Sequence, residues 1–243
     1  MENQTPDYTY QNVIQINDAD ASRKFLANVF AWMFVALGIS AGFAYSFANV
    51  ASLKDLLIDP LTNQPTFLSF IVMLSPLAFV LTMSFGVNRI SYAGLSIIFI
   101  LYSIATGVSF SFILWEYTKS SVLGVFLTSS LVFGIMAVAG YTTKTDLTKF
   151  GSLLIFALFG IIIASFINFF LHSQTLDYLV SYIGVAVFVG LTAYDVQKLK
   201  NIGAGIQYGE ASSKKMALMG GLTLYLDFIN LFLFLIRIFG RRR

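Results

Sequence analysis

Long apolar runs fill most of this sequence, and their length limits what the chain can fold into. A transmembrane helix needs about 20 consecutive apolar residues. Seven runs approach that length, and short polar breaks with proline, glycine or charged residues separate them. The runs are 25–48, 67–86, 91–114, 121–141, 147–171, 178–196 and 216–239. We therefore expect an all-α integral membrane protein, a bundle with one transmembrane helix for each run.

The composition excludes a soluble domain and narrows the possible functions. The chain is 57% hydrophobic and 11% charged, whereas a soluble domain has about 25% charged residues. We expect a polar N-terminal segment at 1–24, one transmembrane domain at 25–240 and a basic tail at 241–243. The lysines and arginines form no basic face, so no nucleic-acid partner is expected. The absence of cysteine and the single histidine, His172, leave little material for a metal centre built from these residues.

Lysine and arginine positions predict the orientation of the chain in the membrane. Cytoplasmic loops carry an excess of these residues. An N-terminus in the cytoplasm leaves only Lys54 and Lys119 in the outer loops. It places the following residues inside: Arg23, Lys24, Arg89, Lys144, Lys149, Lys198, Lys200, Lys214 and Lys215. The segment 1–24 lacks the features of a cleaved secretory signal, so we expect it to be cytoplasmic and the first span to be retained.

The basic tail leaves two arrangements of the last segment open. Seven complete spans place Arg241, Arg242 and Arg243 outside, whereas a last segment that re-enters and returns would place them inside. The charge rule favours the second arrangement. The length and apolar character of 216–239 favour the first, which we expect.

Asp227 interrupts the last apolar run, in LYLDFINLF. A charged residue at the centre of a membrane helix costs about 2.5–3.5 kcal/mol on insertion scales, so it is a functional candidate. Spacing of three and four residues places Thr223 and Asn230 on the same face as Asp227. The alternative is a single polar contact that holds helices together.

Asp195 is the second candidate, near the cytoplasmic end of its run in GLTAYDVQKLK. Thr192 and Lys198 share its face. An exposed pair with Lys198 is one explanation and would contribute under about 1 kcal/mol. However, a negative charge near a helix C-terminus is unfavourable for stability. If Asp195 and Asp227 meet, they share a proton and titrate as a pair. Ionised, the two carboxylates suit Ca²⁺, with Asn230 as a further ligand.

The two motifs LTAYDVQKLK and LYLDFINLFLFLIRIFG, together with the loop GYTTKTDLTKFGSLL, resemble the signature of the Bax inhibitor-1 family, also called the transmembrane Bax inhibitor motif family. The resemblance implies a seven-helix bundle with the last helix at its centre. It also implies a pH-sensitive calcium leak channel, with Asp195 and Asp227 as a di-aspartyl sensor. In relatives an arginine of the second helix latches onto this pair; the basic residue nearest to that helix here is Arg89, beyond its expected end in GVNRIS.

Two other functions stay open at this stage. An intramembrane aspartyl protease also carries a YD motif and a second aspartate in the next helix, but its second motif is GxGD, and here Asp227 follows Leu224, Tyr225 and Leu226. A non-catalytic modulator of a membrane protease complex is the other possibility that the resemblance offers. We favour the channel. We expect no enzyme activity, no cofactor other than Ca²⁺ as bound or transported ion, and a bacterial inner membrane as the location.

Overall fold

The computed structural model describes residues 18–205 and 211–243. Within these ranges the chain forms a bundle of helices, in the order α1 (Asp18–Asn49), α2 (Ala51–Leu57), α3 (Phe67–Gly86), α4 (Tyr92–Glu116), α5 (Lys119–Thr142), α6 (Thr148–Leu171), α7 (Gln174–Ala204) and α8 (Ala211–Phe239). Seven of them, all except α2, are long and apolar enough to cross a membrane. The predicted all-α fold with seven spans is confirmed.

Local hydrogen bonds define where several helices begin. Ser91 caps α4 by accepting a hydrogen bond from the backbone N–H of Gly94 at 3.2 Å, and Ser173 caps α7 by accepting from Leu176 at 3.3 Å. Before α6, Asp146 Oδ1 accepts from the backbone N–H of Thr148 at 2.9 Å. Hydrogen bonds from Thr148 hold the pKa of Asp146 below its usual value. These polar residues lie in the turns and leave the helix interiors apolar.

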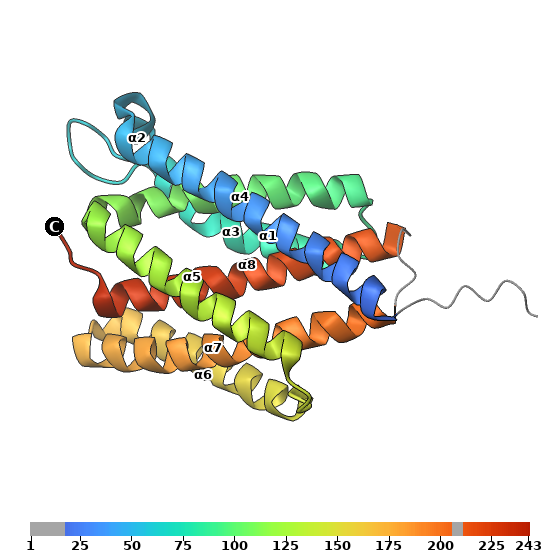
Figure 1. Ribbon diagram of the computed structural model, residues 1–243. Helices are drawn as coiled ribbons and strands as arrows, with labels where there is room; N and C mark the ends of the chain where they lie inside the picture. Colours follow the sequence, from blue (N-terminus) through green and yellow to red (C-terminus); the bar gives the residue numbers. More distant parts are fainter. Residues whose placement is uncertain (1–17, 206–210) are drawn as a thin grey trace, which may run out of the picture.

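Helix α8 packs against α1, α4, α5 and α7 (Figure 1). It is the most buried of the candidate spans, and α6 is the least buried. Its buried residues include Leu218, Leu224, Tyr225 and Leu231, each fully enclosed. The side chains of α8 therefore form much of the core, while α3 and α6 expose most of their surface.

Two glycines allow backbones to approach closely. A Cβ atom at Gly140 of α5 would lie 2.2 Å from the carbonyl oxygen of Ala193 in α7. A Cβ atom at Gly221 of α8 would lie 2.6 Å from Cβ of Trp32 and 3.1 Å from the carbonyl oxygen of Val29, both in α1. Small residues commonly allow such contacts between membrane helices. The region around Asp195 is thus in direct contact with α5.

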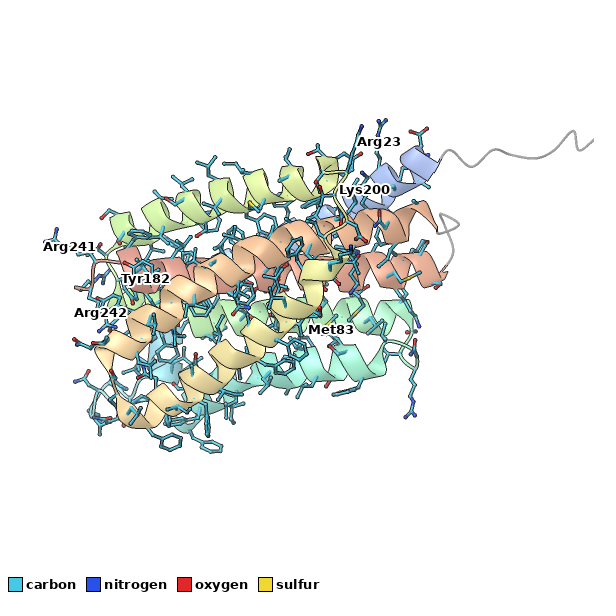
Figure 2. All side chains as sticks on the ribbon, turned by 90° about the horizontal axis from the view of Figure 1, so that it is seen from below. Arg23, Met83, Tyr182, Lys200, Arg241 and Arg242 are labelled. Atoms are coloured by element: carbon cyan, nitrogen blue, oxygen red, sulfur yellow. The ribbon has the colours of Figure 1, made fainter. Side chains whose placement is uncertain are left out.

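The basic tail lies at the opposite end of the bundle from the start of α1. Figure 2 shows Arg23 and Lys200 at one end and Arg241 and Arg242 at the other. The backbone N–H of Thr118 donates to the carbonyl oxygen of Arg241 at 3.0 Å, which joins the tail to the turn between α4 and α5. Because α8 is one continuous helix, it crosses once and does not return. The arrangement with seven complete spans therefore describes this chain.

Candidate functional site

Asp227 lies inside the bundle on the side of α8 that faces α7. It is only 5% exposed. It precedes Arg237 by ten residues, which is about 15 Å along a helix, or about half the thickness of a hydrocarbon core. Its Oδ2 atom is buried and has no hydrogen-bond partner in the part of the chain that the structure describes. A buried polar atom without a partner is rare and needs an explanation beyond packing.

Asp195 of α7 meets Asp227 of α8 through a contact between their side chains. An ionised carboxylate only accepts hydrogen bonds, so a hydrogen bond between the two groups needs a proton on one of them. Asp195 is partly buried, whereas Asp227 is enclosed. The structure therefore brings together the two acidic residues that the sequence singled out, and we refer to them as the acidic pair.

The three polar residues expected to support the acidic pair bond mainly to their own helices. Thr192 Oγ1 donates to the carbonyl oxygen of Phe188 at 2.7 Å, and Thr223 Oγ1 donates to that of Met219 at 3.1 Å. Each hydroxyl has a single hydrogen, so neither donates to the pair. Asn230 Nδ2 likewise donates to the carbonyl oxygen of Leu226 at 2.8 Å.

Arg89 is not at the acidic pair in this structure. It lies in the exposed turn between α3 and α4, because α3 ends at Gly86. None of the ion pairs found among the described residues includes it. The cation whose charge acts on Asp195 is Lys198, an exposed residue on the same helix whose ammonium lies 5.8 Å from the centre of the Tyr194 ring. No ion pair joins Lys198 to Asp195 among the described residues. The latch inferred from the family resemblance is thus not formed by Arg89 in this conformation.

Gln197 is a residue that the sequence reasoning missed. Its Oε1 accepts from the backbone N–H of Leu147 at 2.8 Å, and its Nε2 donates to the carbonyl oxygen of Thr145 at 2.8 Å. One amide therefore holds the α5–α6 loop against α7, two residues beyond Asp195. Gln197 belongs to the motif LTAYDVQKLK, and its partners belong to the loop motif GYTTKTDLTKFGSLL. The sequence contains both motifs but does not show that they bond to each other.

A second buried polar cluster lies on the opposite side of α8. The hydroxyl of Tyr225 lies 2.7 Å from Ser40 Oγ of α1, and Ser40 Oγ donates to the carbonyl oxygen of Ser103 in α4 at 2.8 Å. Tyr102 packs edge-on against Tyr225, with ring centroids 5.4 Å apart. Successive helix residues differ in direction by about 100°, so Tyr225 and Asp227 point to different faces. Helix α8 thus makes polar contacts on two sides.

The acidic pair defines what the site can do chemically. Two carboxyl groups that share a proton titrate together, and their oxygen atoms are the ligands that Ca²⁺ prefers. In the described ranges no group of three or more His, Cys, Asp or Glu side chains is placed to hold a metal ion. Since Ca²⁺ takes six to eight oxygen ligands, the pair would supply only part of a coordination shell.

The fold and the acidic pair define a class of multi-pass membrane proteins with one acidic residue on each of the last two helices. A family model described as "Inhibitor of apoptosis-promoting Bax1" matches residues 22–243. The chain belongs to this family, the Bax inhibitor family, which confirms the resemblance inferred from its motifs.

Bacterial relatives match over nearly the whole chain. The inner membrane protein YbhL of Escherichia coli strain K12 is 46% identical over 220 residues, which cover 90% of this chain and 92% of the relative. An uncharacterized protein of Borreliella burgdorferi is 43% identical over 220 residues, with 90% and 93% covered. An uncharacterized membrane protein of Streptococcus pyogenes serotype M1 is 35% identical over 220 residues, again with 90% and 93% covered. None of these descriptions states a catalytic activity.

Proposed function

We propose that this chain is a pH-sensitive calcium leak channel whose opening is controlled by the acidic pair. The observation that carries the proposal is the contact between the side chains of Asp195 and Asp227. It joins α7 to the most buried helix of the bundle through groups that change charge when they lose a proton. Buried ionisable residues inside membrane helices mark ion pathways and proton relays.

The electrostatic repulsion between the two ionised carboxylates is large enough to change how α7 and α8 pack. With one shared proton, the pair carries one negative charge and a hydrogen bond between α7 and α8. Without that proton, two negative charges face each other. Two such charges about 4 Å apart repel by about 4 kcal/mol at an effective dielectric constant of 20. Moving a two-state equilibrium from 1:99 to 99:1 takes about 5.5 kcal/mol, so the proton controls a large part of such a change.

Calcium would act on the same pair as a competitor of the proton. A divalent cation near both carboxylates compensates the two charges that repel in its absence. Only two carboxylates are available, and the described part of the chain brings no third acidic side chain to them. Such a partial shell binds weakly, which favours passage of the ion over retention.

The distribution of basic residues supports a cytoplasmic N-terminus. Arg23 and Lys200 lie at the same end of the bundle (Figure 2), the end that also carries the α3–α4 and α5–α6 turns with Arg89 and Lys144. Excess basic charge in loops favours the cytoplasmic side. We infer a bacterial inner membrane as the location, in keeping with the description of the Escherichia coli relative.

The surroundings of the acidic pair do not favour an aspartyl protease. Asp227 sits within one continuous helix, whereas the GxGD motif opens the backbone near the catalytic aspartate. The side chain of Asp227 is enclosed. Two pockets of about 570 and 580 Å³ lie elsewhere in the bundle, and neither is lined by Asp195 or Asp227. A peptide substrate would need such a cleft between the two carboxyl groups.

Reconstitution into liposomes tests the proposal. The purified chain is expected to admit Ca²⁺ into vesicles that contain a calcium-sensitive dye. Asp227→Asn is expected to change the rate severalfold, because it fixes one member of the pair in a neutral form. Asp177→Asn is the control, since Asp177 is partly exposed and pairs with Arg237 at 3.5 Å at the tail end. Absence of calcium entry at every pH would refute the proposal.

A further inference from the structure

A groove between α1 and α5 opens at the tail end of the bundle. It has a volume of about 580 Å³ and is lined by residues of α1, α4, α5 and α8. Its walls are mainly small and aromatic, and they include Ala41, Ala44, Phe126, Phe228 and Phe232. Helices α1 and α5 do not pack against each other along their lengths; α4 and α8 close the back of the space (Figure 1). The open side therefore faces the bilayer.

The groove has the depth of one membrane leaflet. Along α1 its lining runs from Leu37 to Asn49, which is about 18 Å at the rise of an α-helix. Half of a hydrocarbon core is about 15 Å, and half of a bilayer with its head groups is about 20 Å. Near its inner end Ser40 contacts Tyr225. An extended acyl chain of one leaflet therefore fits the length of the groove.

The mouth of the groove is basic. Lys119 and Arg243 both line it, and neither belongs to an ion pair found in the described ranges. Lys119 Nζ donates to Asn49 Oδ1 at 3.1 Å, and this neutral partner positions the ammonium without cancelling its charge. Trp115 also lines the mouth, with Lys54 over its ring at 5.6 Å. Tryptophan and basic side chains are typical of the head-group level of a membrane.

We propose that this groove is a binding site for an anionic phospholipid of the leaflet at the tail end. One acyl chain would lie between α1 and α5 against Ala41 and Phe126, and the phosphate would lie between Lys119 and Arg243. Charge selects the head group, because neither cation has a carboxylate partner within residues 18–205 and 211–243. Shape selects a lipid over a helix, because the space is narrow, leaflet-deep and open to the side. This lipid site is independent of calcium passage.

Fluorescence of Trp115 tests the site directly. The chain has two tryptophans, so Trp32→Phe leaves Trp115 as the only one. This variant would be reconstituted in vesicles that contain phosphatidylglycerol or phosphatidylcholine with brominated acyl chains. Quenching of Trp115 is expected to saturate at a lower mole fraction of brominated phosphatidylglycerol than of brominated phosphatidylcholine. Lys119→Gln is expected to weaken this preference roughly fivefold, the effect of one basic charge near an anionic surface.

Matched variants distinguish lipid binding in the groove from lipid contact elsewhere on the surface of the bundle. Ala41→Phe fills the groove and is expected to reduce saturable quenching by both lipids, whereas Ala31→Phe, an exposed position of α1 that does not line the groove, is expected to have no effect. Lys149→Gln, at the opposite end, is the control for charge. Native mass spectrometry with the same two lipids measures the preference between them in the chain that retains Trp32. Equal quenching by the two lipids, or unchanged quenching in Ala41→Phe, would overturn the proposal.

Discussion

Tyr225 of α8 and Ser40 of α1 are joined by a buried hydrogen bond of 2.7 Å. Because the hydrogen of Ser40 is used in its bond to the Ser103 carbonyl, the phenol of Tyr225 donates and Ser40 accepts. This hydrogen bond joins one side of α8 to α1, and the acidic pair joins the other side of α8 to α7. Any change in the pair therefore acts on a helix that is already held by α1.

Tyr225→Phe is expected to lower the stability of the bundle without changing its packing volume. The substitution removes one buried hydrogen bond, which contributes about 0.5–1.5 kcal/mol, and leaves the bond from Ser40 to Ser103 in place. We expect a lower apparent melting temperature in detergent. Tyr182→Phe, at a position that is 59% exposed, serves as the control. Equal melting temperatures for the two variants would mean that the Tyr225 hydroxyl contributes nothing to stability.

Gly140→Ala is expected to destabilise the contact between α5 and α7. The new Cβ atom would lie 2.2 Å from the Ala193 carbonyl oxygen, and a backbone atom moves only if the helix moves. Overpacking of this kind costs about 1–3 kcal/mol. The matched control is Gly134→Ala on the same helix, where no atom lies within 4 Å of the new Cβ. That control is expected to gain up to about 1 kcal/mol from helix propensity, so the two melting temperatures should move in opposite directions.

Gln197→Ala is expected to release the α5–α6 loop from α7. It leaves the backbone N–H of Leu147 and the carbonyl oxygen of Thr145 without the partner that each now has. Hydrogen–deuterium exchange of residues 143–148 should become faster, and Gln197→Glu, which retains only the acceptor, should give an intermediate rate. Lys214→Ala, exposed at the same end, should leave exchange unchanged. Unaltered exchange in Gln197→Ala would contradict the role assigned to this amide.

The turn between α3 and α4 and the basic tail are expected to label from opposite sides of the membrane. The chain has no cysteine, so single cysteines give no background. In intact cells, Arg241→Cys should react with an impermeant maleimide. Arg89→Cys should react only after the membrane is permeabilised. Labelling of both positions from the same side would contradict a last helix that crosses completely.

Apolar length predicted most of the fold, because a membrane span has a fixed thickness. The ends of the helices were harder to predict. Helix α7 continues to Ala204, beyond the predicted end at 196. In this added part Lys200 bonds to the end of α5 and Gln197 bonds to the α5–α6 loop. Helix α2 was missed altogether, since its 7 residues, which include Lys54 and Asp55, have neither the length nor the composition of a span.

The acidic pair could be located from sequence, but its surroundings could not. A carboxyl group in an apolar run is conspicuous because it is costly. Thr192 and Thr223 lie on the expected helix faces, yet their hydroxyls bond to the carbonyl four residues earlier. This acceptor is within reach of a threonine hydroxyl in any α-helix. The partners of Gln197 come from residues about 50 positions away. Such partners depend on tertiary packing.

The most direct test of the acidic pair is the pH profile of calcium entry into liposomes. The wild type should show a rate that changes with pH. Asp195→Asn with Asp227→Asn should show one rate at every pH, equal to that of the wild type at the acidic end, because asparagine imitates a protonated aspartate. The same pH dependence in the double variant as in the wild type would contradict control by the acidic pair.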